Sequence, residues 1–180
     1  MNKIIPILTE ADIPAMYAQT PIGKLLRYHN LDCPYEIYSK AQLLVGMCMD
    51  NRKHLHIPDN FAYIIRAGGA NLQHSEFKVA YAIAVGQVRH IALIGHNHCG
   101  MVNLVNRRDE FINGLVQNAG WDYELAKVHF DHFAPKFEIG NEVEFVKREA
   151  ARLRLRYPLV QVAPMIYLVE DNKLYLCAED

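Results

Sequence analysis

Two short motifs in this chain have the side chains that metal-assisted hydrolysis needs. Cys48, Asp50 and Arg52 form the first, and the second, residues 96–99, contains two histidines and a cysteine. Together they offer two thiols, an imidazole and a carboxylate-guanidinium pair. Zinc binds sulfur and nitrogen tetrahedrally, and a site with three protein ligands keeps a fourth position for water. The motifs therefore predict a catalytic zinc centre whose bound water ionises near neutral pH.

The spacing within the first motif suggests how it could assist that reaction. Arg52 lies two residues after Asp50, so in extended backbone both side chains point to the same side. A guanidinium and a carboxylate can then form two parallel hydrogen bonds, which keep the carboxylate ionised. An ionised carboxylate only accepts hydrogen bonds. We expect Asp50 to accept one from a zinc-bound hydroxide and to aim its lone pair at an electrophilic carbon.

The elements around the motifs predict how they come together. Apolar runs of strand length alternate with segments of helical period, which favours parallel β-α units. The first motif follows residues 41–47 and the second follows residues 90–95. Sites in open α/β sheets gather beyond the carboxyl ends of the strands. The expected fold is α/β, with a mostly parallel central sheet flanked by helices and a C-terminal edge hairpin; the expected strands are 43–48, 62–66, 90–94, 160–169 and 173–177.

Two further segments have helical signals. Ser75 can cap a helix that runs to about residue 85, with Ala80, Ile83 and Ala84 facing the core. The stretch 103–157 predicts two or three more helices. Within it, positions 144, 148, 152 and 156 recur at steps of four, so the charged side chains there share one helix side.

The motifs resemble the two signatures of the beta class of carbonic anhydrases, a family that includes hydrolases of carbon disulfide and carbonyl sulfide. Those signatures, C-x-D-x-R and H-x-x-C-G, stand here at residues 48–52 and 96–100, with a similar Arg-Ala-Gly-Gly turn between them. The resemblance implies that Cys48, His96 and Cys99 hold zinc and that Asp50 and Arg52 form the catalytic dyad. It also implies reversible hydration of carbon dioxide to bicarbonate by zinc-bound hydroxide.

Several positions depart from the family pattern and leave the substrate open. Asn51 stands where serine is usual, His98 where aspartate is frequent, and Ala67 displaces an asparagine. The Cys-Gly-Met continuation at residues 99–101 is also seen in the carbon disulfide and carbonyl sulfide hydrolases. We therefore keep two alternatives, a hydrolase of one of these gases and a non-catalytic protein that senses zinc or bicarbonate. A structural zinc site, with Asp50 as its fourth ligand, is a further alternative.

The choice between His96 and His98 as the ligand follows from the turn. Side chains three residues apart across a tight turn converge more easily than adjacent ones, which favours His96 beside Cys99, as in the family. His98 is then free to carry protons, as are the histidines at positions 54, 56 and 74. Surface or packing roles are more common for such histidines, so we assign none of them to catalysis.

Composition narrows the class of protein. A chain of 180 residues with 19 basic and 20 acidic side chains has a formal charge of -1, which disfavours binding to nucleic acid or to an anionic membrane. Without a secretory signal or a spanning segment, we expect a cytoplasmic protein. We expect a single zinc-binding α/β domain over residues 41–180 and a helical arm over residues 1–40. In the resembled family such helices contact a second subunit, which implies a homodimer or a larger even oligomer.

Overall fold

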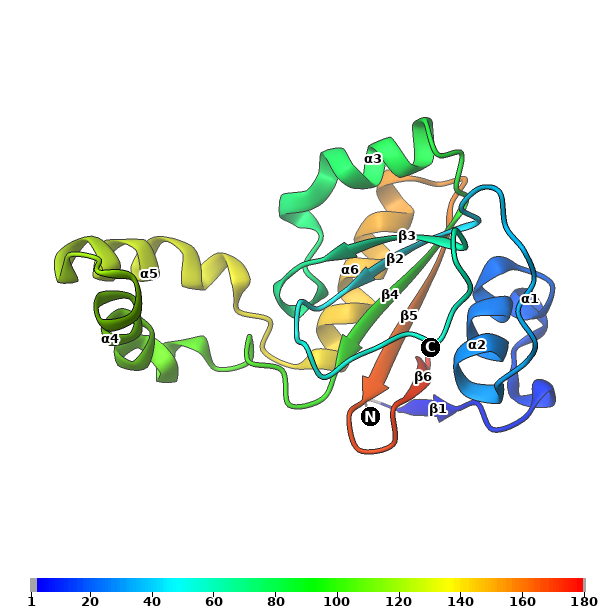
Figure 1. The fold of residues 1–180 in the computed structure, drawn as a ribbon, viewed down its shortest axis with the longest axis horizontal. Coiled ribbons are helices and arrows are strands. Elements are labelled where there is room, and N and C mark those ends of the chain that lie inside the picture. Colours follow the sequence, from blue (N-terminus) through cyan, green and yellow to red (C-terminus); the bar gives the residue numbers. More distant parts are fainter. Residues whose placement is uncertain (1–2, 180) are drawn as a thin grey trace.

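The computed structural model describes residues 3–179 and is built around one six-stranded sheet (Figure 1). The strand order is β1-β6-β5-β4-β2-β3. Four strands are parallel, namely β2 (Leu43–Met47), β3 (Ala62–Arg66), β4 (His90–His96) and β5 (Gln161–Leu168). β6 (Lys173–Cys177) and β1 (Ile4–Pro6) are added antiparallel beyond β5. The predicted α/β fold is confirmed, with β1 as the edge beyond the C-terminal hairpin.

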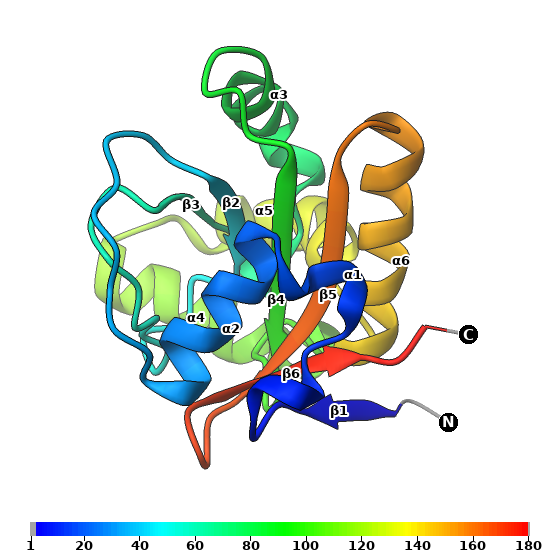
Figure 2. The ribbon, with the colours of Figure 1, turned by 90° about the vertical axis from the view of Figure 1, so that its right-hand side faces the viewer.

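Helices cover both faces of the sheet (Figures 1 and 2). On one face lie α1 (Ala15–Ala18) and α2 (Pro21–Leu31), and on the other lie α3 (Glu76–Ala84) and α6 (Glu142–Arg156). Each face of the sheet has its own hydrophobic core. Alternate residues of β2 point into different cores, because Val45 belongs to the core with α2 and Leu44 to the core with α3 and α6. Burial on both faces explains why the parallel strands are continuous apolar runs in the sequence.

The N-terminal segment belongs to these same layers. Thr20 accepts a hydrogen bond from Gly23 N–H and so caps α2, and Pro21 occupies its first turn. Ile22, Leu25 and Leu26 of α2 are fully buried in the core that α2 shares with the sheet. The apolar side of the expected arm is therefore covered within its own chain. The division at residue 40 and the homodimer stay predictions, and residues 1, 2 and 180 lie outside the described part of the chain.

The predicted helix after residue 75 is present, but it turns a different stripe inward. Val79 and Ala82 of α3 are buried, whereas Ile83 is half-buried and Ala84 is exposed. Because α3 lies beside the outer strand β3, only a narrow i, i+3 stripe of the helix meets the core. Ser75 precedes the helix without a side-chain capping hydrogen bond.

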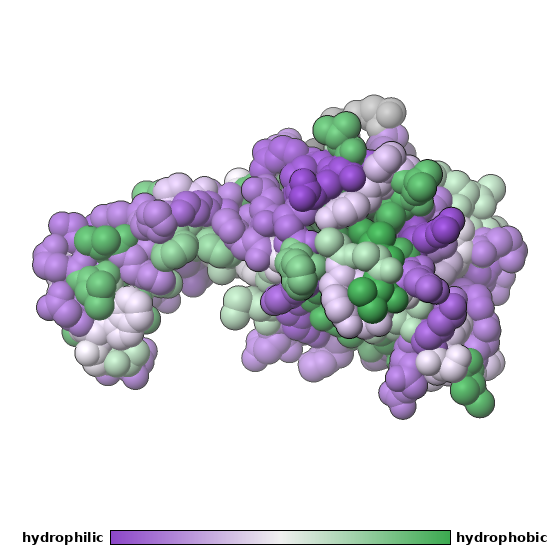
Figure 3. Space-filling view, turned by 90° about the horizontal axis from the view of Figure 1, so that it is seen from above, coloured by the Kyte–Doolittle hydropathy of each residue, from purple (hydrophilic) through white to green (hydrophobic). Residues whose placement is uncertain are grey.

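The stretch 103–157 forms three α-helices, of which two make a hairpin that projects from the sheet (Figures 1 and 3). After a 3-10 turn, η4 (Leu104–Arg107), the hairpin consists of α4 (Arg108–Ala119) and α5 (Tyr123–Phe137). Ile112, Ala126 and Phe130 lie in its own small core. At its base, the carboxylate of Glu138 accepts hydrogen bonds from the backbone N–H groups of residues 103, 104 and 140. Within residues 3–179, no helix combines the length and hydrophobicity needed to cross a membrane.

Candidate metal centre

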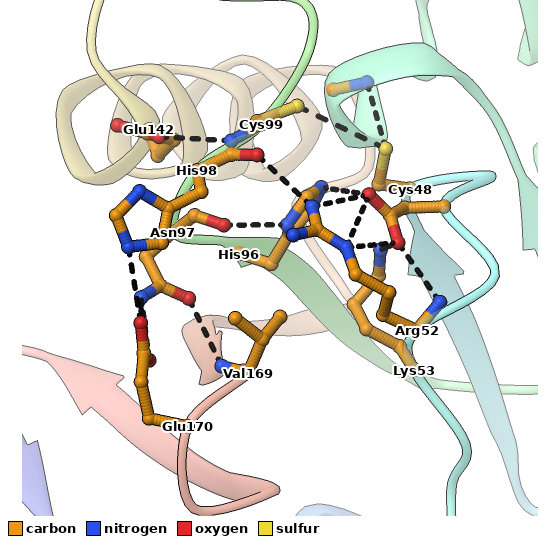
Figure 4. Close-up of polar contacts among 12 residues, drawn as sticks. Cys48, Arg52, Lys53, His96, Asn97, His98, Cys99, Glu142, Val169 and Glu170 are labelled. Carbon is orange, nitrogen blue, oxygen red and sulfur yellow. Dashed lines mark hydrogen bonds and ion pairs between the residues drawn. The ribbon is translucent and has the colours of Figure 1, made fainter.

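Two cysteines and a histidine meet where β2 and β4 end. These strands are parallel neighbours, so the chain leaves both at the same edge of the sheet. Cys48 directly follows β2, His96 ends β4, and Cys99 lies in the next turn (Figure 4). All three are buried, and their ligand atoms lie within 4.8 Å of one another, with the two sulfurs 4.0 Å apart. Ligands of one tetrahedral zinc ion, at about 2.0–2.3 Å from the metal, are separated by about this much.

The imidazole of His96 is oriented for a metal. Its Nδ1 lies 2.8 Å from the carbonyl oxygen of Asn97, which can only accept a hydrogen bond, so Nδ1 carries the proton. The Nε2 atom is buried and has no hydrogen-bond partner among the described residues. An unsatisfied buried nitrogen costs about 1–3 kcal/mol, and a metal ion would remove that cost. The donor set and this free lone pair together fit zinc.

Backbone N–H groups hold both cysteines in place. Gly69 N–H donates to Cys48 Sγ at 3.3 Å, and Cys99 N–H donates to Glu142 Oε1 at 3.3 Å. The contact between the two sulfurs lowers the pKa of Cys48 and raises the pKa of Cys99. A dication bound by both sulfurs would require both cysteines to lose their protons.

Asp50 and Arg52 form the paired arrangement expected from their spacing. Arg52 Nε donates to Asp50 Oδ1 at 3.0 Å, and Nη2 donates to Oδ2 at 2.7 Å. The Arg52 guanidinium holds the pKa of Asp50 well below its ordinary value. Asp50 Oδ2 lies 3.8 Å from His96 Nε2, so the carboxylate adjoins the candidate metal position. The five predicted side chains therefore lie at one place.

Two residues to which the sequence analysis gave no role complete the surroundings. Arg66, the last residue of β3, donates hydrogen bonds to the carbonyl groups of Cys48, Asp50 and Lys53 at 3.1 to 3.3 Å. The side chain of Lys53 is fully buried, with Nζ 3.7 Å from Asp50 Oδ1. Arg66 could have been identified from the sequence, because it stands at the end of the expected strand 62–66, as Cys48 does at the end of its own strand. For Lys53 the sequence contains no such signal, since lysine usually indicates a surface position.

His98 does not join the cluster. Its φ angle is 53°, and its exposed ring places Nε2 3.0 Å from Glu170 Oε1 (Figure 4). Asn97 donates to the same carboxylate, so Glu170 holds two side chains on the solvent side of the turn between His96 and Cys99. Of the other histidines considered for proton transfer, His56 packs its ring against His29, with the ring centroids 5.3 Å apart. A role for any of them in proton transfer stays a prediction.

An apolar pocket of about 430 Å³ lies between the turns that carry Cys48 and Cys99 and the helical hairpin. Of its lining residues, Met49 and Met101 belong to the turns that hold the cysteines, and Gly68 lies in the turn after β3. The rest of the lining comes from η4, α4 and α5 and is mainly aromatic, namely Leu104, Phe111, His129, Phe130, Phe133, Ala134 and Phe137. The pocket thus offers an apolar surface beside the candidate metal centre.

Fold and site together define an α/β protein with a Cys-His-Cys cluster that could hold a metal ion, beyond the ends of two parallel strands. A family model described as carbonic anhydrase matches residues 47–167, more than half of the chain. The chain belongs to the beta-class carbonic anhydrase family. A search of curated proteins gives no match.

Solved structures of the same fold agree with this assignment. A carbonic anhydrase from Glaciozyma antarctica is 22% identical with a TM-score of 0.59, over 79% of this chain and 86% of that one. The beta-carbonic anhydrase isoform I from Trichomonas vaginalis is 16% identical with a TM-score of 0.61, over 81% and 88%. The apo form of a carbon disulfide hydrolase is 20% identical with a TM-score of 0.55, over 77% and 79%. At these identities the likeness concerns the fold.

Proposed function

We propose that this chain catalyses the reversible hydration of carbon dioxide to bicarbonate, with zinc held by Cys48, His96 and Cys99. The observation that carries the proposal is the orientation of Asp50. Its carboxylate adjoins the three donors, yet both oxygens are turned to Arg52. Three protein ligands with a carboxylate beside them are what a hydrolytic zinc site requires.

The roles of the side chains follow from their hydrogen-bonding capacity. Bound zinc would supply a hydroxide near neutral pH, because it lowers the pKa of a water molecule to about 7. Asp50, kept ionised by its contact with Arg52, would accept a hydrogen bond from that hydroxide and so direct the oxygen lone pair at the carbon of the substrate. Arg52 keeps the carboxylate in this orientation, and Arg66 fixes the loop that carries both.

The test combines metal analysis with a hydration assay over pH. We expect about one zinc ion per chain and carbon dioxide hydration well above the spontaneous rate. Asp50→Ala should nearly abolish turnover while zinc stays bound, whereas Asp109→Asn, a change at an exposed position of α4, should leave both unchanged. Wild-type protein that holds zinc but hydrates no carbon dioxide at any pH would refute the proposal.

The apolar pocket favours a second candidate, hydrolysis of carbon disulfide or carbonyl sulfide at the same site. Both molecules are larger and more polarisable than carbon dioxide, and a methionine and aromatic lining accommodates sulfur. Rates measured side by side with the three gases separate the two functions. A higher kcat/KM for a sulfur-bearing gas would make the hydrolase the main activity.

The homodimer or larger even oligomer, the cytoplasmic location and the boundary at residue 40 belong to this proposal as well. The family assignment supports the assembly, whereas the location and the boundary are predictions from the sequence. Sedimentation of the active, zinc-loaded protein tests the assembly. An active monomer would refute it.

A further inference from the structure

Lys53 is a buried cation one residue beyond the Asp50–Arg52 pair. Its side chain has 0% exposure, and among the described residues its Nζ has no hydrogen-bond partner. Its ion-pair partner is Asp50, with Nζ 3.7 Å from Oδ1. An isolated buried ammonium is destabilising by several kcal/mol. Lysine is almost never fully buried unless it is paired, so the location of this one beside the dyad has to be explained.

The two cations that face Asp50 differ in their contact with solvent. The Arg52 side chain is 47% exposed, so water and salt screen its attraction and the side chain can move away. Lys53 is enclosed and stays next to the carboxylate. Burial lowers the pKa of Lys53, and Arg66 lowers it further, whereas Asp50 and the sulfurs of Cys48 and Cys99 act in the opposite direction. Lys53 is thus the enclosed cationic partner of Asp50, on the buried side of this loop.

Asp50 has a second orientation within reach. Its Oδ2 lies 3.8 Å from His96 Nε2, the free donor of the candidate metal site. Carboxylate oxygen is a common zinc ligand. A small rotation of Asp50 would therefore make it a fourth ligand and close the position that a substrate needs. The attraction of its cationic partners opposes that rotation.

We propose that Lys53 is a positioning residue that keeps the Asp50 carboxylate off the metal, in the orientation that the proposed reaction uses. Lys53 acts on the reaction through Asp50 alone, from the buried side of the loop, while Arg52 acts from the solvent side. The kinetic consequence rests on the proposed function, whereas the effect on metal coordination does not.

The decisive variant is Lys53→Met, which keeps the length of the side chain and removes its charge. Lys53 Nζ has no hydrogen-bond partner among the described residues, and Asp50 keeps Arg52 as a cationic partner, so this exchange leaves no unpaired buried charge. We therefore expect an unchanged or higher Tm and full zinc content. The kcat/KM for carbon dioxide should fall about 10- to 100-fold, as is typical when the partner of a metal-site group is lost. Lys78→Met, on the exposed side of α3, is the matched control and should change none of these.

Cobalt substitution gives a readout that does not depend on turnover. In wild-type protein with Co²⁺ in place of zinc, azide should bind at the open position and change the visible absorption spectrum. In Lys53→Met that response should be lost or need at least tenfold more azide, because Asp50 occupies the position. An unchanged azide response would overturn the proposal. If wild-type protein hydrates no carbon dioxide, the proposed function fails, and the cobalt spectra still decide the role of Lys53.

A double-mutant cycle separates positioning from general structural support. In an Asp50→Asn background, Lys53→Met should change kcat/KM less than about twofold, because the residue through which it acts is already altered. The same loss in both backgrounds would overturn the proposal, and so would a fall in Tm parallel to the loss of activity. If Lys53→Met does not fold, Lys53→Gln, which is neutral and of similar size, is measured in the same way.

Discussion

Replacement of Arg52 by methionine should greatly lower the rate of carbon dioxide hydration and change the free energy of unfolding only slightly. The guanidinium donates to both oxygens of Asp50, at 2.7 to 3.2 Å, and Nη2 also donates to the carbonyl of His98 at 3.0 Å. In Arg52→Met these side-chain contacts are lost, and only the backbone N–H of residue 52 still donates to Asp50. The carboxylate then keeps Lys53 as its remaining cationic partner.

The expected magnitudes differ because the pair is exposed. With the Arg52 side chain 47% exposed, solvent screening limits its contribution to the free energy of unfolding to at most about 1 kcal/mol. For a chain of this size that corresponds to a Tm shift of about 2–4 °C. A nucleophile that is no longer held in position costs on the order of 100-fold in rate, which is about 2.7 kcal/mol of barrier. Stability should change little while activity nearly disappears.

The assay is stopped-flow hydration of carbon dioxide by zinc-loaded protein, with zinc content and urea unfolding measured on the same samples. Arg107→Met is the control, since that arginine is also exposed and pairs with Glu110 at 3.7 Å on the hairpin. It should reproduce the small stability change and keep the wild-type rate. A fully zinc-loaded Arg52→Met protein within threefold of the wild-type rate would show that the dyad does not orient the nucleophile.

Three other changes test the surroundings of the site. Gly69→Ala should lower the unfolding free energy by about 1–3 kcal/mol, because φ is +63° and a Cβ would lie 2.6 Å from Ile139; Gly114→Ala in α4, with 3.9 Å of space, should be neutral or stabilising in the same urea titration. Burial lowers the pKa of His29 to about 4, below the ordinary 6.5. Protonation then favours the unfolded chain, so stability is complete above about pH 6.5 and falls toward pH 4. From pH 7 to pH 5 the loss should be about 2 kcal/mol, and it should be absent in His29→Gln. His96→Ala should remove most of the bound zinc without changing the circular dichroism, and full zinc content would exclude His96 as a ligand.

The strands and the cluster at their ends were predictable because the signals are local. β2 and β4 are buried on both faces, so each is a continuous apolar run in the sequence. Cys48 and His96 each stand at the end of such a run. Parallel neighbouring strands have their carboxyl ends at the same edge of the sheet. The two local patterns therefore predict that these side chains lie close together.

Contacts between distant segments could not be predicted in this way. Glu142 accepts the N–H of Cys99 across 43 residues, and Glu170 contacts His98 across 72 residues. No periodic pattern relates these pairs, because each depends on how α6 or the C-terminal hairpin packs. The inward stripe of α3 was mispredicted for a related reason. Helical period identifies possible faces, but the neighbours of the helix decide which face is buried.

Lys53 shows how the same tertiary contacts determine the electrostatics of the centre. A lysine directly after an exposed arginine would be expected at the surface from sequence alone. In the fold, Arg66 donates to three carbonyl groups of the loop from residue 48 to residue 53, and the side chain of Lys53 is enclosed behind Asp50. The three candidate metal ligands could be identified from the sequence motifs alone. The position of Lys53 beside the Asp50 carboxylate, in contrast, depends on Arg66, which lies thirteen residues further along the chain.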